Sequence, residues 1–208
     1  HYGVRTGHIA FGGERLGVYY LEKGASQRPS KVIYDRKHSA FSESRPGDYD
    51  WDEIFEDAGW FHFTGITAAL SHTVREVCAE ACAAAKRHGV TVSCDLNYRK
   101  TLWSEQEAQS VMRPLMESVD VLFANEEDIE KSLGLRAADS DVVSGKLSVA
   151  GYSALMGRLA GEFGFKAVAV SLRESLSASD NNWSALLYSG GEVYESKKYG
   201  IHIVDRVG

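Results

Sequence analysis

The sequence is poor in cysteine and proline, with three of each in 208 residues. Cys78 and Cys82 are four residues apart, the spacing of neighbouring turns of a helix, and the cysteines form neither a disulfide framework nor a zinc-binding pattern. We therefore expect them to be small core residues of a reduced, cytoplasmic protein.

Long apolar runs and an excess of positive charge are also lacking. No run of about 18 apolar residues is present, so the sequence predicts no membrane helix, and no segment resembles a signal peptide. The formal net charge of -6 argues against general nucleic-acid binding. We expect neither a membrane nor a nucleic acid as partner.

The common nucleotide and hydrolase motifs are missing as well. No G-x-G-x-x-G follows a predicted strand, and no G-x-x-x-x-G-K-[ST] occurs, so dinucleotide and P-loop sites lack support. The absence of H-E-x-x-H, of Cys/His clusters and of G-x-S-x-G disfavours zinc hydrolases and α/β-hydrolases.

What is present is the composition of one ordinary globular domain. Hydrophobic residues make up 44% and charged residues 25% of the chain, whose length allows one substantial core with an appendage. We expect a single domain over residues 1–208. The chain starts at His1 without a methionine and stops at Gly208, where a strand pattern runs into a glycine, so we expect a fragment truncated at both ends.

The hydrophobic pattern predicts strands and helices in alternation. An antiparallel pair is expected at Val18–Leu21 and Lys31–Arg36, on either side of a turn-prone segment. Period-two and period-3.6 patterns then alternate along the chain. The expected strands are 60–64, 91–96, 120–124 and 166–170, and the expected helices begin at Ser71, Ser104, Asn125 and Tyr152. Repeated strand–helix units predict an α/β fold with a parallel sheet and helices on both faces. A hairpin over 184–188 and 193–204 is expected to follow, around Gly190-Gly191.

Polar clusters come directly after three of the predicted strands. They are Asn97–Arg99, Asn125–Asp128 and Ser171–Ser175. Because ligands bind beyond the carboxyl ends of strands in open α/β sheets, these clusters predict one rim of a binding site. The alternative for the first cluster is a solvated loop with Arg99 in water.

The early strand pair carries a second group of polar aromatic residues. Side chains alternate along a strand, so Tyr34 and Arg36 share a face, and Tyr19 is placed to lie on the facing strand. The alternative is an exposed ribbon with ordinary surface tyrosine and arginine.

Several of these stretches together resemble the ribokinase-like (PfkB) carbohydrate kinases, most closely the members that phosphorylate 2-keto-3-deoxygluconate. The resemblance covers essentially the whole chain and rests on SCDLNYRKTLW, VDVLFANEED, AVAVSLRES and IHIVDRVG. Its most specific part is D-x-N-Y-R-x-x-L-W. It implies a three-layer α/β body with a small β-sheet lid, here within about residues 17–40, and a homodimer formed through the lid.

The resemblance also implies roles for individual residues. Lid and body residues that contact a sugar acid match Tyr19, Tyr34, Arg36 and Arg99. Residues near the nucleotide match Asn97, Ser171, Arg173, Glu174 and Ser175, in a segment without the family's usual glycines. Residues that support Mg²⁺ through water match Asn125 and Asp128, where Asp replaces the usual Glu.

The expected function is therefore ATP-dependent, Mg²⁺-dependent phosphorylation of a sugar acid, most similar to 2-keto-3-deoxygluconate. The family's catalytic Asp lies in a G-x-G-D turn expected just after Gly208, so this chain lacks it. Asp205, beside that turn, is a candidate for a K⁺ site. The alternatives are a kinase of a neutral sugar such as fructose or ribose, and a sugar-acid-binding protein of kinase descent that no longer transfers phosphate.

Overall fold

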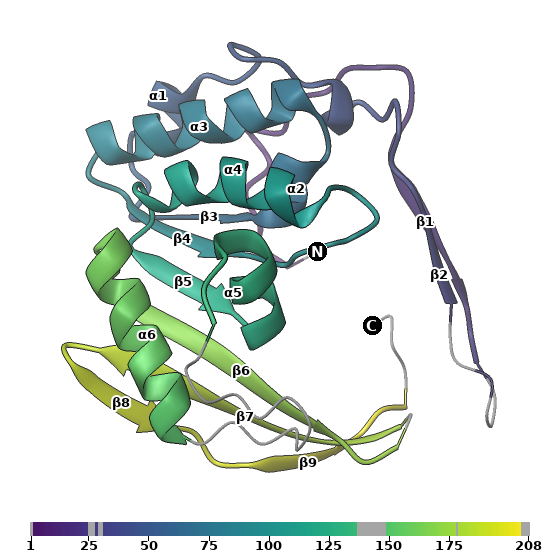
Figure 1. Ribbon diagram of the computed structural model, residues 1–208. Coiled ribbons are helices and arrows are strands. Elements are labelled where there is room, and N and C mark those ends of the chain that lie inside the picture. The colour runs from purple at the N-terminus through teal and green to yellow at the C-terminus, as the bar shows by residue number, and fades with distance from the viewer. Residues whose placement is uncertain (1, 25–27, 29–30, 137–148, 178, 205–208) are drawn as a thin grey trace.

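The structure is a computed structural model that describes residues 2–24, 28, 31–136, 149–177 and 179–204. A mixed sheet of seven strands forms the body, and a separate two-stranded ribbon stands beside it (Figure 1). The body strands lie in the order β3-β4-β5-β6-β7-β8, with β9 paired to β7. The strands are β1 (Val18–Glu22), β2 (Lys31–Asp35), β3 (Trp60–Thr64), β4 (Thr91–Asp95), β5 (Val121–Ala124), β6 (Ala167–Ser175), β7 (Asp180–Ser189), β8 (Glu192–Glu195) and β9 (Tyr199–His202). The α-helices are α1 (Trp51–Phe55), α2 (Gly65–Ala69), α3 (His72–Arg87), α4 (Glu105–Met116), α5 (Glu126–Leu133) and α6 (Val149–Phe163).

The first four body strands, β3 to β6, run parallel, so their carboxyl ends meet at one edge of the sheet. Strands β7, β8 and β9 complete the sheet in antiparallel fashion. This arrangement confirms the predicted α/β class, with a parallel-rich sheet and a small separate antiparallel sheet.

Side-chain caps start three of the helices where the sequence predicts them. The Ser71 hydroxyl accepts a hydrogen bond from the Val74 amide, and the Ser104 hydroxyl accepts one from the Glu107 amide. Asn125 caps α5, which ends at Gly134 with a positive φ of 71°.

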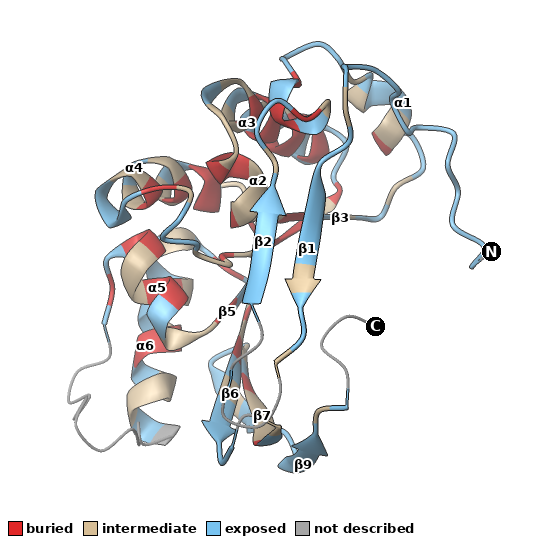
Figure 2. Cartoon of the chain, turned by 90° about the vertical axis from the view of Figure 1, so that its right-hand side faces the viewer, coloured by how far each residue is buried: buried red, intermediate tan, exposed pale blue. Residues whose placement is uncertain are grey.

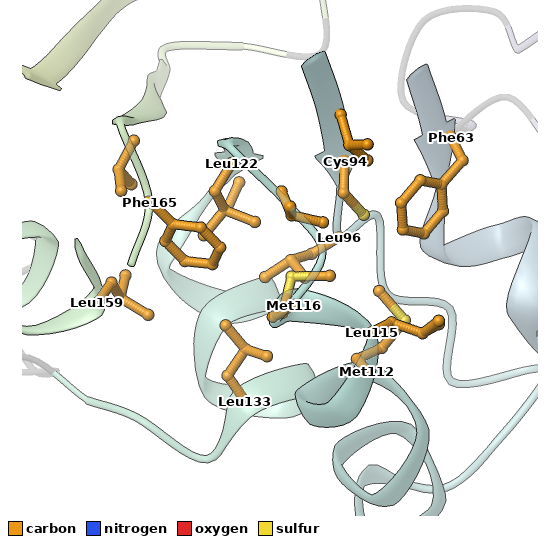
Figure 3. Packing of buried hydrophobic residues seen from close by; sticks show 14 of the residues in the cluster. Phe63, Cys94, Leu96, Met112, Leu115, Met116, Leu122, Leu133, Leu159 and Phe165 are labelled. Atoms are coloured by element: carbon orange, nitrogen blue, oxygen red, sulfur yellow. The ribbon is translucent and has the colours of Figure 1, made fainter. Parts of the chain in front are cut away.

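The core lies between the sheet and the helices. Alternate residues of the strands point toward the helices, among them the fully buried Val92, Leu122 and Val168. Figure 3 shows Met112, Leu115 and Met116 of α4 in one cluster with Leu122 of β5 and with Leu96, which follows β4. Cys78, Cys82 and Cys94 are buried free thiols, as expected of core residues.

Helices α3 to α6 cover one face of the body sheet, and the two views agree on this (Figures 1 and 2). On the opposite face, Trp60, Phe123 and Leu187 are 57%, 40% and 41% exposed. Among the described residues, the predicted helical cover is therefore present on one face. None of the described helices is long and apolar enough to cross a membrane.

Two expectations at the end of the chain are wrong. Strand β6 does not end at Val170 but continues to Ser175, because all five residues 171–175 pair with β7. The run 193–204 is not one hairpin arm: β8 and β9 are separate strands that pair with different halves of β7.

Candidate functional site

The loop after β4 is fixed to both neighbouring strands. Asn97 has a positive φ of 43°, a conformation that asparagine tolerates better than most residues, and its Nδ2 donates a hydrogen bond to Thr64 Oγ1 at 3.2 Å. The Leu96 amide donates to the Phe123 carbonyl at 3.1 Å. The ends of β3, β4 and β5 are thus joined into one rim.

Asp128 lies beneath this loop and ties it to α5. Its Oδ1 accepts a hydrogen bond from the Tyr98 amide at 3.1 Å, and its Oδ2 accepts one from Asn125 Nδ2 at 3.0 Å. Burial raises the pKa of Asp128 to about 6, although the Tyr98 amide and the charge of Arg99 act in the opposite direction. The structure therefore brings Asn125 and the desolvated carboxylate of Asp128 together, and it joins them to the loop that carries Asn97.

Arg99 lies on the outer side of the same loop. Its side chain is exposed, and its Nη1 donates to the Tyr98 carbonyl at 2.8 Å. Burial raises the pKa of the nearby Asp95, whereas the Asn97 amide and the positive charges of His62 and Arg99 oppose that shift. The guanidinium is thus held at the rim, and the described residues leave most of its donors available to a ligand.

The ribbon formed by β1 and β2 carries the other predicted substrate residues. Tyr19 pairs with Tyr34, their ring centroids are 6.1 Å apart, and each side chain is about half exposed. The Arg36 guanidinium carbon lies 3.9 Å from the centroid of the Tyr34 ring. The predicted common face of Tyr19, Tyr34 and Arg36 is therefore present. In Figure 1 the ribbon stands on the side of the body where the loop after β4 projects.

Hydrogen bonds to Arg15 hold the base of the ribbon. Its guanidinium donates to the Asp35 carboxylate at 2.9 Å, to the Asp35 carbonyl at 2.9 Å and to the Lys37 carbonyl at 3.0 Å. Arg15 is not among the predicted residues, because nothing in its local sequence shows that it folds back onto the second strand.

The predicted nucleotide residues of β6 fall on two faces of the sheet. Ser171, Arg173 and Ser175 alternate onto the face opposite the helices, while Glu174 points the other way and accepts a hydrogen bond from Asn182 at 3.0 Å. Arg173 Nε donates to Asn181 Oδ1 at 2.9 Å. These residues therefore belong to a paired strand, with Ser171, Arg173 and Ser175 on one face of the sheet and Glu174 on the other.

A hollow of about 500 Å³ lies beside the rim, on the sheet face opposite the helices. It is lined by Trp60, His62, Ser93, Asp95 and Phe123. Ser93 Oγ accepts a hydrogen bond from Trp60 Nε1 at 2.8 Å and is 2.7 Å from His62 Nδ1. Sequence reasoning missed this hollow because Trp60 and His62 read as residues of a buried strand. Asp205 and Gly208 lie outside the described residues.

Comparison with known proteins identifies the family. The profile of the pfkB family carbohydrate kinases matches residues 1–149. The 2-dehydro-3-deoxygalactonokinase of Haloferax volcanii is 39% identical over 194 residues, which are 93% of this chain and 54% of that protein. The crystal structure of 2-dehydro-3-deoxygluconokinase from Thermotoga maritima superposes with a TM-score of 0.92 at 50% identity, covering 99% of this chain and 60% of that one.

A more distant relative is the 2-dehydro-3-deoxygluconokinase of Thermoproteus tenax, which is 33% identical over 64% of this chain and 41% of that protein. The chain thus spans about half the length of the curated relatives that it matches. The family profile covers more than half of the chain, and the fold agrees with it: the chain belongs to the pfkB family of carbohydrate kinases.

Proposed function

We propose that the protein transfers the γ-phosphoryl group of ATP to a hydroxyl group of a 2-keto-3-deoxy sugar acid. The observation that carries the proposal is the ribbon face on which the Arg36 guanidinium lies over the Tyr34 ring, with Tyr19 paired opposite Tyr34. The names of the relatives from Haloferax and Thermotoga support the same substrate class.

The proposed substrate residues would bind different groups of the sugar acid. Arg36 and Arg99 would bind the carboxylate, because a guanidinium offers charge-assisted and bidentate hydrogen bonds to two oxygens. Tyr19 and Tyr34 would pair with sugar hydroxyls and cover the carbon backbone. Closure of the ribbon over the rim would exclude water and so limit hydrolysis of ATP.

The rim also fits the proposed magnesium site. Asp128 keeps carboxylate lone pairs beyond the two that accept hydrogen bonds, and a buried carboxylate with a raised pKa gains from a nearby cation. Asn125 and Asp128 would act through water, as is usual for Mg²⁺ held mainly by phosphates. Bound with ATP, the ion would offset the charge of the phosphate groups. Asn97 would face the phosphates from the same loop. We assign the general base to none of the described residues.

We place the protein in the cytoplasm, where ATP is available and where cysteines remain reduced. We also propose that it forms a homodimer through the ribbon, since an isolated two-stranded ribbon with exposed apolar residues is poorly stabilised alone.

A coupled ATP-consumption assay on the full-length gene product tests the function. The substrates are 2-keto-3-deoxygluconate, 2-keto-3-deoxygalactonate, fructose and ribose, each with and without Mg²⁺. We expect Mg²⁺-dependent turnover with at least one of the two sugar acids and little with the neutral sugars. Preference for a neutral sugar would overturn the roles of the two arginines. Sugar-acid binding without turnover would favour a non-catalytic binding protein, the alternative suggested by the lack of glycines in 171–175.

A further inference from the structure

The pairing of β6 with β7 assembles a polar group that neither strand shows alone. Arg173 lies opposite Trp183, and Ser175 lies opposite Asn181, so all four side chains occupy the sheet face away from the helices. Asn181 is only 1% exposed. Its Oδ1 accepts hydrogen bonds from Arg173 Nε at 2.9 Å and from Ser175 Oγ at 3.1 Å.

These contacts fix the guanidinium of Arg173 without using its outer nitrogens. The Nε atom is bound to Asn181, and the guanidinium carbon lies 5.5 Å from the centroid of the Trp183 ring. Within the part of the chain that the structure describes, the two terminal nitrogens make no hydrogen bond or ion pair. The exposed end of the side chain therefore presents its terminal N–H donors in a restrained orientation, which suits two oxygens of one anion.

Asn181 itself is poorly explained as a stabilising residue. Its Nδ2 is buried and has no hydrogen-bond partner among the described residues. An unpaired buried amide costs stability, whereas an apolar residue of similar size at this position would not carry that cost. The oxygen of this amide accepts hydrogen bonds from Ser175 and from Arg173, and the second of these orients the guanidinium.

We propose that Asn181 is a positioning residue that holds Arg173 to bind a phosphate group of the nucleotide. The inference rests on the proposed kinase function for the identity of that anion. A phosphate fits better than the sugar carboxylate, because Arg36 and Arg99 already provide guanidinium groups for a single carboxylate. Arg173 lies on β6, two strands away from β4 in the sheet, and Arg99 lies in the loop that follows β4 at the same edge.

The test measures KM for ATP and KM for the sugar acid in the full-length protein. Asn181→Ala should raise KM for ATP about tenfold and leave KM for the sugar acid within about twofold, because a lost charge-assisted contact at one substrate weakens that substrate alone. Arg173→Ala should raise KM for ATP at least as much. The double variant should be no worse than Arg173→Ala, since Asn181 acts through Arg173.

Asn182→Ala is the matched control. Asn182 is the neighbouring amide on the same strand, but it points to the opposite face and contacts Glu174. Both KM values should stay at the wild-type level in this variant. Equal increases of both KM values in Asn181→Ala, together with a lower Tm, would indicate a packing role and overturn the proposal. Independent, multiplicative effects of the two single changes would also overturn it.

Arg173→Lys keeps the test decisive if Asn181→Ala does not fold. This change leaves the buried amide in place and retains the charge, but lysine has neither the planar fork nor the Nε donor. We expect KM for ATP to rise about tenfold, because Asn181 contributes by orienting the guanidinium and a lysine keeps only the charge. An unchanged KM would contradict the positioning role.

Equilibrium binding of ATP with Mg²⁺, measured by calorimetry, separates this inference from the proposed function. If no sugar is phosphorylated but ATP binding weakens about tenfold in Asn181→Ala, the kinase proposal fails and the phosphate site stands. If turnover is normal and the variant binds ATP like the wild type, the kinase proposal stands and this inference fails. If the wild type neither binds ATP nor phosphorylates a sugar, both fail.

Discussion

Arg99 is exposed, whereas the rim carboxylates Asp95 and Asp128 are partly or fully buried. Its hydrogen bond to the Tyr98 carbonyl sets its direction, and no other described residue accepts a hydrogen bond from this guanidinium. Arg99→Ala should lower kcat/KM for the sugar acid by about 10- to 100-fold, or roughly 1.4–2.7 kcal/mol, the range of a charge-assisted contact. Use of a neutral sugar should fall by less than about threefold. Steady-state kinetics on both substrates check this.

Lys100→Ala is the control, because Lys100 is the adjacent exposed cation on the same loop. It should leave both kcat/KM values unchanged. A loss of the same size on both substrates in Arg99→Ala would show that the arginine supports the loop and does not select the carboxylate.

At the scale of single residues, the sequence predicted where a residue lies in a helix or strand better than it predicted which residue is its hydrogen-bond partner. The spelling N-E-E-D correctly indicated that Asn125 starts a helix. It did not reveal that the Asp128 carboxylate accepts the Tyr98 amide, because that bond joins segments 30 residues apart. For the same reason Asn181 was missed: its partner Arg173 is identified only by the register of two paired strands.

At the scale of elements, the strands and long helices of the α/β body could be predicted, but the end of β6 could not. The apolar pattern stops at Val170, yet the strand continues for five residues, whose backbone groups bond to β7. This extension depends on a strand that comes later in the chain, so local pattern cannot indicate it. The short helices α1 and α2 were missed because each has only five residues and too little periodicity to detect.

The junction of β3 and α2 requires glycine. A Cβ at Gly65 would lie 2.1 Å from the Leu96 carbonyl oxygen, and that carbonyl belongs to the backbone that leads into Asn97. Gly65→Ala should therefore lower the free energy of unfolding by about 1–3 kcal/mol or more, because backbone must move to admit the methyl group. Activity should fall with it, since the rim is displaced. Urea denaturation and the kinase assay measure the two effects.

Gly161→Ala in α6 is the opposite case. Apart from its chain neighbours and the helix's own backbone, no atom of the described residues lies within 4 Å of a Cβ built at Gly161. This change should raise the free energy of unfolding by about 0.5–1 kcal/mol, because alanine favours a helix interior. If Gly65→Ala destabilised the protein no more than Gly161→Ala, the end of β3 would not lie as close to the Leu96 carbonyl as the structure shows.

The ribbon has two faces with different proposed partners. Tyr19, Tyr34 and Arg36 occupy one face, so the other face, with the exposed residues Tyr20 and Ile33, remains for a second copy of the chain. Ile33→Glu places a charge in that apolar face and should convert the dimer to a monomer. Size-exclusion chromatography with light scattering measures the mass.

Tyr19→Ser tests the division between the two faces. It should leave the mass of the dimer unchanged while raising KM for the sugar acid several-fold, because it removes a group on the substrate face only. A wild-type protein that stays monomeric at high concentration would refute the dimer, and a monomeric Tyr19→Ser variant would refute the assignment of faces.

At the scale of the whole molecule, the reactivity of the three cysteines measures whether α3 stays packed against the sheet. Cys78 and Cys82 lie on α3, Cys94 lies on β4, and all three are at most 5% exposed. Burial raises the pKa of Cys78 and of Cys82 to about 12, and it raises the pKa of Cys94 well above its ordinary value. Because the thiolate is the reactive form, the folded protein should resist thiol reagents.

We therefore predict that modification of Cys78, Cys82 and Cys94 follows global unfolding. Peptide mass spectrometry of the full-length protein should give one common rate for the three thiols, and this rate should rise with urea as steeply as unfolding does. A cysteine introduced by Ser110→Cys, at an exposed position of α4, should react at once and serves as the control. Ligands that bind only the folded state must slow the reaction of the buried thiols, and ATP with Mg²⁺ at ten times its Kd should slow it about tenfold. If the modification rates changed neither with urea nor with ligand, α3 would open locally. The core would then not be the single cooperative unit that its packing indicates.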